Sequence, residues 1–333
     1  MATATTSTIS LPINNFYVRN MLQAAQPADV HGRYLQMVDL PAGEGTQTVK
    51  WRRYSNITNT TTALTEGVTP PSSSQTVTDI SATTSQYGTY IPLTDQVNLL
   101  SVEKPLVQIG EKLGQQAGHT ADVTRRDVLI AGANAYYSGG TTTATVDEGL
   151  TGSLLKKAIR ALKRTNTTKI TGGYSGTTSV GTTPIRAGFV GIIHPDTSTS
   201  LEAVSGFVPV IEYPRQDAMP DEVGAFKEIR FFESTNAEIE EDAGAAIGAT
   251  GFITTTGTLI DVYKTLIFGA DYAGGVALAG HAMKKYIVPP GEATIGDPLA
   301  QKGTVGWKGQ WVTKILNDDF GIRIEHGNLD TPA

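Results

Sequence analysis

The residue types that most often carry catalysis or bind metals are few and scattered in this sequence. Its 333 residues include no cysteine, which excludes disulfides, thiolate zinc sites, iron–sulfur clusters and cysteine nucleophiles. The histidines show no metal-ligand spacing between any pair, and each is interpreted as a surface or packed side chain. They are His31, His119, His194, His281 and His326. The sequence therefore predicts no metal site.

Motifs for phosphate binding and nucleophilic catalysis are missing as well. The sequence has no Gly-Lys dipeptide for a phosphate-binding loop, no His-Glu-x-x-His, and no serine with glycines two positions before and after it. The glycine-rich segment 172–176 lies in a Thr-rich stretch with no suitable helix after it, so it is a weak candidate for a dinucleotide site. We therefore predict no cofactor.

Two groups of carboxylates remain as candidates for acid–base work or calcium binding, an acidic run at 238–242 and a pair at 318–319. The run lacks the alternating oxygen ligands and the fixed glycine of a calcium loop, which favours a solvated surface. The sequence therefore indicates a protein that is not an enzyme. The alternative from another class is an α/β hydrolytic or binding enzyme with its site near His194, Pro195 and Asp196.

Composition restricts the class of protein further. The net charge is −6 and the sequence pI is about 5.4, which argues against the broad basic surface of a dedicated nucleic-acid binder. Residues 1–10 lack the basic and apolar regions of a secretory signal. No stretch approaches the roughly 18 apolar residues of a membrane span, so no membrane contact is expected. Abundant Thr and Gly favour strands and long connections.

An arm and a ribbon are predicted before the first helix. Residues 1–45 open with a Thr/Ser tract and form either a frayed terminus or an arm that reaches over another subunit. Strands are predicted at Val49–Tyr54 and Gln86–Val97, and no Lys or Arg occurs from Tyr54 to Glu103. Because a long structureless loop is unusual inside a compact domain, residues 46–97 are predicted to project as a two-stranded ribbon that needs a partner surface. A disordered linker is the alternative.

A long helix is the clearest pattern in the sequence. Apolar residues recur over 101–137 with a mean interval of about 3.6, and Ser138–Gly140 is expected to end the helix. Such a helix is about 50 Å long and serves as a structural spine. Gly110, Gly114 and Gly118 fall on one stripe, where each costs roughly 1 kcal/mol relative to alanine. The stripe predicts close approach of another backbone.

A second helix is predicted between Thr- and Gly-rich linkers. Its apolar side carries Leu154, Leu155, Ala158, Ile159 and Leu162. The opposite side is the only concentrated basic face of the sequence, formed by Lys156, Lys157, Arg160, Lys163 and Arg164. This face is interpreted as a solvated surface, or as a contact with phosphate or with an acidic neighbouring subunit.

From Arg186 onward the pattern is typical of an α/β unit. Ala187–Ile193 predicts a buried strand, and Asp196 or Thr197 is expected to cap a short helix that runs through Val204. Further strands are predicted at Glu228–Phe232, Val262–Phe268 and Tyr286–Val288.

The last segment is predicted to form a hairpin. Trp307–Leu316 and Phe320–Glu325 are its arms, and Asn317–Asp319 is its turn. In the second arm apolar and charged residues alternate, as expected of a strand with one buried face.

Several segments, in order from about residue 46 to 327, together carry a resemblance to a known family. They are Trp51–Ser55, Leu64–Pro70, Gln86–Asp95, Arg126–Leu129, Gly188–Pro195, Asp297–Lys308 and Lys314–Gly321. These segments resemble the major capsid proteins of tailed bacteriophages, in particular the phage N4-type capsid family with the Hong Kong 97-type fold. The resemblance covers nearly the whole chain, which makes it far more specific than any single motif.

The resemblance implies an α+β capsid fold in four parts. These are an N-terminal arm (1–45), an extended β-hairpin loop (46–97), a peripheral domain with a long spine helix (98–184 and 297–333) and an α/β axial domain (185–296). The implied inter-subunit contacts involve the glycine stripe and the loop. The loop residues assigned to these contacts are Glu66, Pro70, Pro71, Tyr87 and Tyr90.

The function implied by the resemblance is that of a major capsid protein. Copies would self-assemble into pentamers and hexamers of the icosahedral virion capsid, in the host bacterial cytoplasm. The implied partners are the chain itself, a portal protein and double-stranded DNA bound without sequence preference, while a decoration or cement protein is left open. An encapsulin-like compartment shell is the alternative of the same fold.

Two departures from the family limit what the resemblance implies. The segment from Tyr54 to Glu103, which includes the tip of the loop, has no lysine, so the isopeptide crosslink made by some members is expected to be absent. Residues 1–45 are Thr-rich and unlike the large charged scaffolding segment of other members. A separate scaffolding protein is therefore expected.

Overall fold

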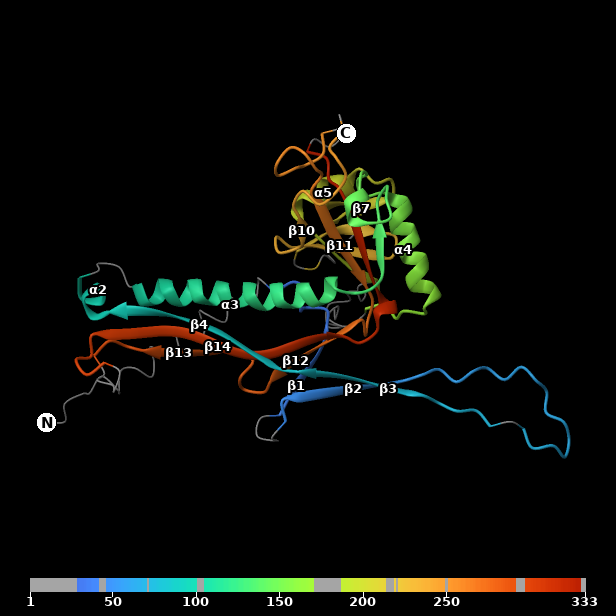
Figure 1. Cartoon of the computed structure of the whole chain (residues 1–333), viewed down its shortest axis with the longest axis horizontal. Helices are drawn as coiled ribbons and strands as arrows, with labels where there is room; N and C mark the ends of the chain where they lie inside the picture. The colour runs from blue at the N-terminus through green and yellow to red at the C-terminus, as the bar shows by residue number, and fades with distance from the viewer. Residues whose placement is uncertain are drawn as a thin grey trace.

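The computed structural model describes residues 29–41, 46–70, 72–100, 105–170, 187–213, 219, 221–248, 251–291 and 297–330. Figure 1 shows one long helix lying along an elongated sheet, a second sheet with its own helices above one end, and a loop that projects past that end. No helix in these ranges is long and apolar enough to cross a membrane.

Helices account for a minor part of the described chain. The α-helices are α2 (Asp95–Leu100), α3 (Pro105–Ile130), α4 (Gly152–Arg164) and α5 (Pro195–Glu202). Single 3₁₀ turns occur at η2 (Thr143–Thr145), η4 (Val210–Glu212) and η5 (Asp318–Phe320).

The first sheet is organised around one long strand, β14. Its strands are β1 (Gln36–Leu40), β4 (Ser85–Thr94), β12 (Ala273–Leu278), β13 (Lys284–Val288) and β14 (Lys302–Ile315). Strand β4 pairs with one edge of β14, whereas β12 and β13 each pair with a different half of β14. All three pairings are antiparallel, and β1 extends the sheet by pairing parallel to β12.

Helix α3 covers one face of this sheet. Leu113 and Ala117 on the helix pack against Val305, Trp307 and Trp311 of β14 in one buried cluster. The two indole N–H groups donate to helix side chains, one to Gln116 at 3.4 Å and the other to Thr124 at 3.1 Å. Buried tryptophan N–H groups usually need such a partner. The helix therefore covers the apolar side chains of this face and also accepts the hydrogen bonds of its two indole groups.

The second sheet is larger and buried on both faces. Its strands are β5 (Ala135–Tyr137), β6 (Phe189–Ile193), β7 (Phe207–Pro209), β8 (Glu222–Phe226), β9 (Ile229–Glu233), β10 (Ile239–Glu240), β11 (Val262–Phe268) and β15 (Gly321–His326). Every residue of β6 is buried, as predicted for Ala187–Ile193. Phe189 and Ile193 join the cluster formed with α4, while Val190 and Ile192 join the cluster on the other face. This division follows from the alternation of side chains along a strand.

Several predicted elements are confirmed with small shifts. The strand predicted at Val262–Phe268 is β11, and those at 228–232 and 286–288 correspond to β9 and β13. The cap of α5 differs from the prediction: His194, and not Asp196 or Thr197, is the N-cap, and its ring accepts a hydrogen bond from the Asp196 N–H at 3.3 Å. Helix α5 ends at Glu202, before the expected Val204.

The ribbon is formed by β2 (Thr48–Tyr54) and β3 (Val77–Thr83), which pair antiparallel as a separate two-stranded sheet. A two-stranded ribbon therefore lies within 46–97, while the assignment of the whole range as one extended loop stays a prediction. The strand predicted at Gln86–Val97 ends at Thr94, because the chain turns into α2 at Asp95. That strand, β4, belongs to the first sheet and not to the ribbon.

The predicted spine helix was too long at its C-terminal end. Helix α3 stops at Ile130, and Ala135–Tyr137 form strand β5, which pairs parallel with β15. A side chain at Gly132, just after the helix end, would collide with the hydroxyl group of Tyr272, which favours glycine there. The helix described is about 39 Å long; the predicted start at 101–104 lies outside the described residues.

The predicted C-terminal hairpin was wrong. Strands β14 and β15 do not pair with each other: β14 is central in the first sheet and β15 lies between β5 and β11 in the second. The turn at η5 therefore carries the chain from one sheet to the other. A Cβ at Gly321 would collide with the ring of Tyr272, so only glycine fits at this crossing.

The strands do not divide between the sheets at the boundaries predicted from the sequence. Strands β12 and β13 fall within 185–296 but belong to the first sheet, and β15 falls within 297–333 but belongs to the second. The chain therefore passes between the two layers more often than the predicted division implies. The assignment of ranges to peripheral and axial domains stays a prediction.

A buried carboxylate joins three separate parts of the chain. Asp122 on α3 accepts hydrogen bonds from the backbone N–H groups of Val30 and His31, at 2.9 and 2.7 Å, and from the amide group of Asn236 at 2.8 Å. The His31 ring lies 3.0 Å from the same carboxylate. Asp122 therefore fixes the segment before β1 and the segment after β9 to the helix.

We expect Asp122→Asn to lower the free energy of unfolding by about 3 kcal/mol, because the change removes the charge from a buried network. Burial acts to raise the pKa of Asp122, but hydrogen bonds from His31 and Asn236 outweigh it and hold the pKa below its ordinary 3.8. The stability that this group contributes is therefore present above pH 3.8 and is lost as the pH falls through the lower folded-state pKa. Urea unfolding as a function of pH measures both effects.

Asp127→Asn is the matched control for this prediction. Asp127 lies on the same helix, but its side chain is 58% exposed and it pairs only with the neighbouring Arg126 in the ion pairs of the described residues. Removing such a pair costs less than about 1 kcal/mol. Equal losses for Asp122→Asn and Asp127→Asn would contradict the role given to Asp122.

Candidate assembly surfaces

The extended loop joins β2 to β3 and contacts almost nothing else. Residues 55–70 and 72–76 are all exposed, and Figure 1 shows them reaching away from both sheets. At its root, Arg52 and Asp79 form a cross-strand ion pair at 3.0 Å, and the Ser55 hydroxyl accepts a hydrogen bond from the Thr76 N–H at 3.0 Å. The loop therefore has an ordered base, and it lies on no surface formed by the described residues.

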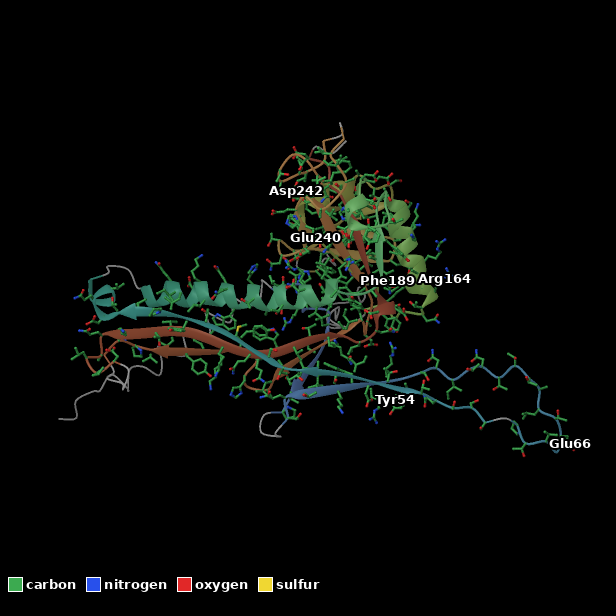
Figure 2. The ribbon with its side chains drawn as sticks, viewed as in Figure 1. Tyr54, Glu66, Arg164, Phe189, Glu240 and Asp242 are labelled. Carbon is green, nitrogen blue, oxygen red and sulfur yellow. The ribbon has the colours of Figure 1, made fainter. Side chains whose placement is uncertain are left out.

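A single turn forms the tip of this loop. The Val68 N–H donates to the Thr65 carbonyl at 3.2 Å, and Gly67 has a φ of 79°. A positive φ at the third position is typical of a type II turn, which favours glycine there. Glu66 stands at the apex (Figure 2), and the exposed fractions of Leu64 and Val68 beside it are 75% and 63%.

The remaining loop residues predicted to contact a neighbour divide into separate groups. Pro70 is exposed in the loop, whereas Pro71 lies outside the described residues. On β4, Tyr87 is half-buried and stacks on Trp311 with 4.7 Å between ring centroids. Tyr90 points to the opposite face of the sheet and is 68% exposed. Of the two tyrosines, only Tyr90 is therefore available to another molecule.

The glycines of the stripe on α3 are buried, but among the described residues the space beside one of them is open. Gly110, Gly114 and Gly118 are all buried in the chain itself. At Gly110, no atom of the described residues lies within 4 Å of the place that a Cβ would occupy. A contact between this stripe and another subunit stays a prediction, and a large side chain at Gly114 would test the folding of the subunit as well as its assembly.

The basic face of α4 has the exposure that the sequence predicted. Leu155, Ala158, Ile159 and Leu162 are buried against the second sheet, and Leu154 is half-buried. The five basic residues Lys156, Lys157, Arg160, Lys163 and Arg164 are all exposed. Figure 2 shows Arg164 on the outer side of the helix, away from α3.

This basic face also forms a shallow groove. Four of its residues, with Ile159, Lys227 and Glu228, line a groove of about 470 Å³. The ammonium group of Lys163 lies 2.5 Å from Glu228, and that of Lys169 lies 3.1 Å from it. The hydrogen bond from Lys163 lowers the pKa of Glu228. Because one carboxylate faces several cations, the groove keeps a positive charge that suits a phosphate or a carboxylate.

A third surface was not expected from the sequence. On the face of the first sheet away from α3, Tyr90 of β4 and Tyr286 of β13 flank Gly306 and Lys308 of β14 in an open trough of about 380 Å³. A Cβ at Gly306 would lie 2.8 Å from the Thr89 carbonyl oxygen, so the floor stays free of side chains. The alternation in Lys284–Val288 signals one exposed face, but only strand pairing brings these residues together.

The candidates for catalysis are used structurally. The His194 ring caps α5 and lies 3.2 Å from Asp196, whose carboxylate accepts a hydrogen bond from the Tyr263 hydroxyl at 2.8 Å. Burial lowers the pKa of His194. It also lowers the pKa of His326, to about 4. In the ranges that the structure describes, no group of three or more His, Cys, Asp or Glu residues is arranged to hold a metal ion.

The acidic run at 238–242 is less solvated than predicted. Glu238 pairs with Arg126 at 2.8 Å, and Glu240 pairs with Lys264. Asp242 accepts hydrogen bonds from the Thr254 hydroxyl and the Thr256 N–H, both at 3.3 Å. These carboxylates therefore hold loops and strands of the second layer in place.

The chain has the Hong Kong 97-type fold in an α+β form, as predicted. The chain is similar to the capsid of Ralstonia phage GP4, with a TM-score of 0.67, 12% identity, and coverage of 90% of this chain and 88% of that chain. It is similar to the head of Helicobacter pylori bacteriophage KHP40, with a TM-score of 0.63, 12% identity, and coverage of 90% and 88%.

The capsid of cyanophage Pam1 is a third similar structure, with a TM-score of 0.60, 10% identity, and coverage of 88% of this chain and 89% of that chain. No protein-family model matches the sequence, and no curated protein matches it significantly. At this level of identity the likeness shows a shared fold.

The two tyrosines of β4 give a direct test of which side chains are free. We expect Tyr87→Ala to lower the free energy of unfolding by about 2 to 3 kcal/mol, because it removes an aromatic side chain from the cluster under α3. Tyr90→Ala is expected to change it by less than about 0.5 kcal/mol, because the side chain is mostly solvated. Urea unfolding of both variants checks this, and a larger loss for Tyr90→Ala would contradict the assignment of the two faces.

Proposed function

We propose that the chain is the major capsid protein of a tailed bacteriophage, and that copies of it assemble into pentamers and hexamers of an icosahedral shell around double-stranded DNA. The observation that carries this proposal is the shared capsid fold, which extends over about nine tenths of the chain in two of the similar structures. The proposed location is the virion capsid, after assembly in the host cytoplasm, and the proposed role is structural and not enzymatic.

The extended loop supports self-assembly independently of the fold. Holding a peptide segment in one conformation costs roughly 1 to 2 kcal/mol per residue in backbone entropy. The loop exposes apolar side chains at Ile57, Leu64 and Val68, whose exposed fractions are 55%, 75% and 63%. A neighbouring subunit that covers this loop would offset the cost of ordering it.

Several finer features belong to the same proposal. A portal protein and a separate scaffolding protein are proposed partners, and a decoration protein is a further one. The N4-type family is the proposed branch of phage capsids. Because the segment from 54 to 103 contains no lysine, the proposed shell is held together by non-covalent contacts. Residues 98–184 and 297–333 are proposed as the peripheral domain and 185–296 as the axial domain, with the strand exchanges described above.

Electron microscopy of the purified chain, alone and with scaffolding protein, is the experiment that tests the proposal. We expect closed shells of uniform size. A matched variant replaces residues 57–74 by Asn-Gly, which closes the ribbon in a short turn. Because this segment packs against no part of the described chain, the variant should remain folded and lose the shells.

Two outcomes would contradict the proposal. One is a monomer or dimer that persists at high concentration in the wild-type chain. The other is normal shells from the loop-shortened variant. Shells that contain cargo proteins and not a genome, when isolated from the native source, would favour an encapsulin-like compartment.

The basic face of α4 is proposed to contact packaged DNA. We expect the combined changes Lys156→Gln, Lys157→Gln and Arg160→Gln to weaken DNA binding. The slope of log K against log salt concentration should become less steep by about 2 to 3, because each phosphate contact contributes roughly 0.9 to it. Binding of labelled duplex DNA in a salt titration measures the slope. The control carries the same charge change at exposed lysines elsewhere, Lys50, Lys112 and Lys302. Equal slopes for the two variants would contradict the proposed DNA contact and favour a solvated surface for the basic face of α4.

A further inference from the structure

We propose that the tip of the extended loop of one copy, residues 64–68, binds in the trough between Tyr90 and Tyr286 on a neighbouring copy of the chain. This inference rests on the proposed function, because it names the partner surface of a loop that the assembly would have to cover. It adds a specific receptor site, which neither the fold nor the sequence motifs identify.

The trough is both apolar and positively charged. Tyr90 and Tyr286 remain 68% and 43% exposed although they belong to paired strands of the same sheet. The ammonium groups of Lys284 and Lys308 lie 5.9 and 5.4 Å from the centre of the Tyr286 ring. Exposed aromatic side chains beside cations suit a ligand that carries apolar groups and a negative charge.

The tip has the complementary chemistry. Leu64 and Val68 present two apolar side chains on either side of the turn, and the carboxylate of Glu66 lies at its apex. From Tyr54 to Glu103 the sequence has no Lys or Arg that would oppose approach to the lysines of the trough. The other cationic groove, on α4, offers only Ile159 as an apolar lining residue, so the two apolar side chains of the tip favour the trough.

Geometry requires that the tip and the trough come from different copies. Figure 1 shows the loop and strand β13 at opposite ends of the long axis of the molecule, with the loop pointing away from the sheet. The tip of one chain therefore cannot reach its own trough. A contact between two different patches of identical copies is head-to-tail, and it closes into a ring when the rotation between copies permits.

Cysteine crosslinking tests this contact on a clean background, since the chain has no cysteine of its own. Glu66→Cys is combined with Lys308→Cys in the full chain, and assembled shells are treated with a mild oxidant. We expect a ladder of disulfide-linked dimers, trimers and larger species on a denaturing gel without reductant. Each single-cysteine variant is expected to stop at dimers.

The matched control combines Glu66→Cys with Lys156→Cys, which places the second thiol on the exposed face of α4. A ladder from this pair and none from the trough pair would overturn the inference. So would shells without crosslinks in either variant, or a disulfide within one chain, which shifts the monomer band only. Failure of the wild-type chain to form any shell would instead remove the proposed function itself.

A charge exchange provides a second readout that needs no oxidant. Glu66→Lys and Lys308→Glu are each expected to raise the protein concentration needed for assembly roughly fivefold, the scale of an exposed ion pair. Together in one chain, the two changes restore the pair in the opposite sense and should return assembly toward the wild-type concentration. Additive losses in the double variant would overturn the contact between the tip and the trough.

Discussion

The contact between α3 and β14 is the interaction on which the rest of the structure depends. Trp307 and Trp311 are buried under the helix, and their N–H groups find partners on Gln116 and Thr124. Because β14 also pairs with β4, β12 and β13, this single contact sets the position of every strand in the first sheet except β1, which follows through β12. Strand β4 lies just after the ribbon, so the direction of the exposed loop is fixed by the same packing.

A second constraint holds the two layers together, and it is electrostatic. Asp122 and Arg126, on adjacent turns of α3, bind the segment before β1 and the segment 236–238 of the second layer. Breaking a buried charge network costs several kcal/mol, whereas surface pairs contribute much less. The buried carboxylate therefore contributes more to holding the layers together than the exposed ion pairs of the ribbon do.

Local patterns in the sequence predicted the elements whose burial is local. The apolar run of β6, the strand β11 and the two-sided helix α4 follow from the spacing of apolar residues. The predicted end of α3 was wrong because Ala135 fits the helical spacing of apolar residues. Its actual structure depends on pairing with β15, which lies far later in the sequence. The hairpin failed for the same reason: β14 and β15 both alternate, but alternation does not say which partner a strand takes. The sequence does not show which of Tyr87 and Tyr90 is buried, because that depends on which face of β4 is covered by α3. The trough likewise depends on the pairing of three strands, β4, β14 and β13.

The low charge of the loop would limit the strength of each contact between its tip and a neighbouring subunit. A loop whose one charged side chain is the carboxylate at its tip would make a weak contact on its own, since an exposed ion pair adds only about 0.2 to 1 kcal/mol. In the proposed closed ring every copy would both give a tip and receive one, so the weak interaction would recur at each interface. A strongly charged or apolar loop would bind more tightly, but it would also pair with other surfaces before the ring closes. The scarcity of charge between β2 and β3 would therefore suit the proposed assembly, because weakly held, misplaced subunits could separate before a shell is complete.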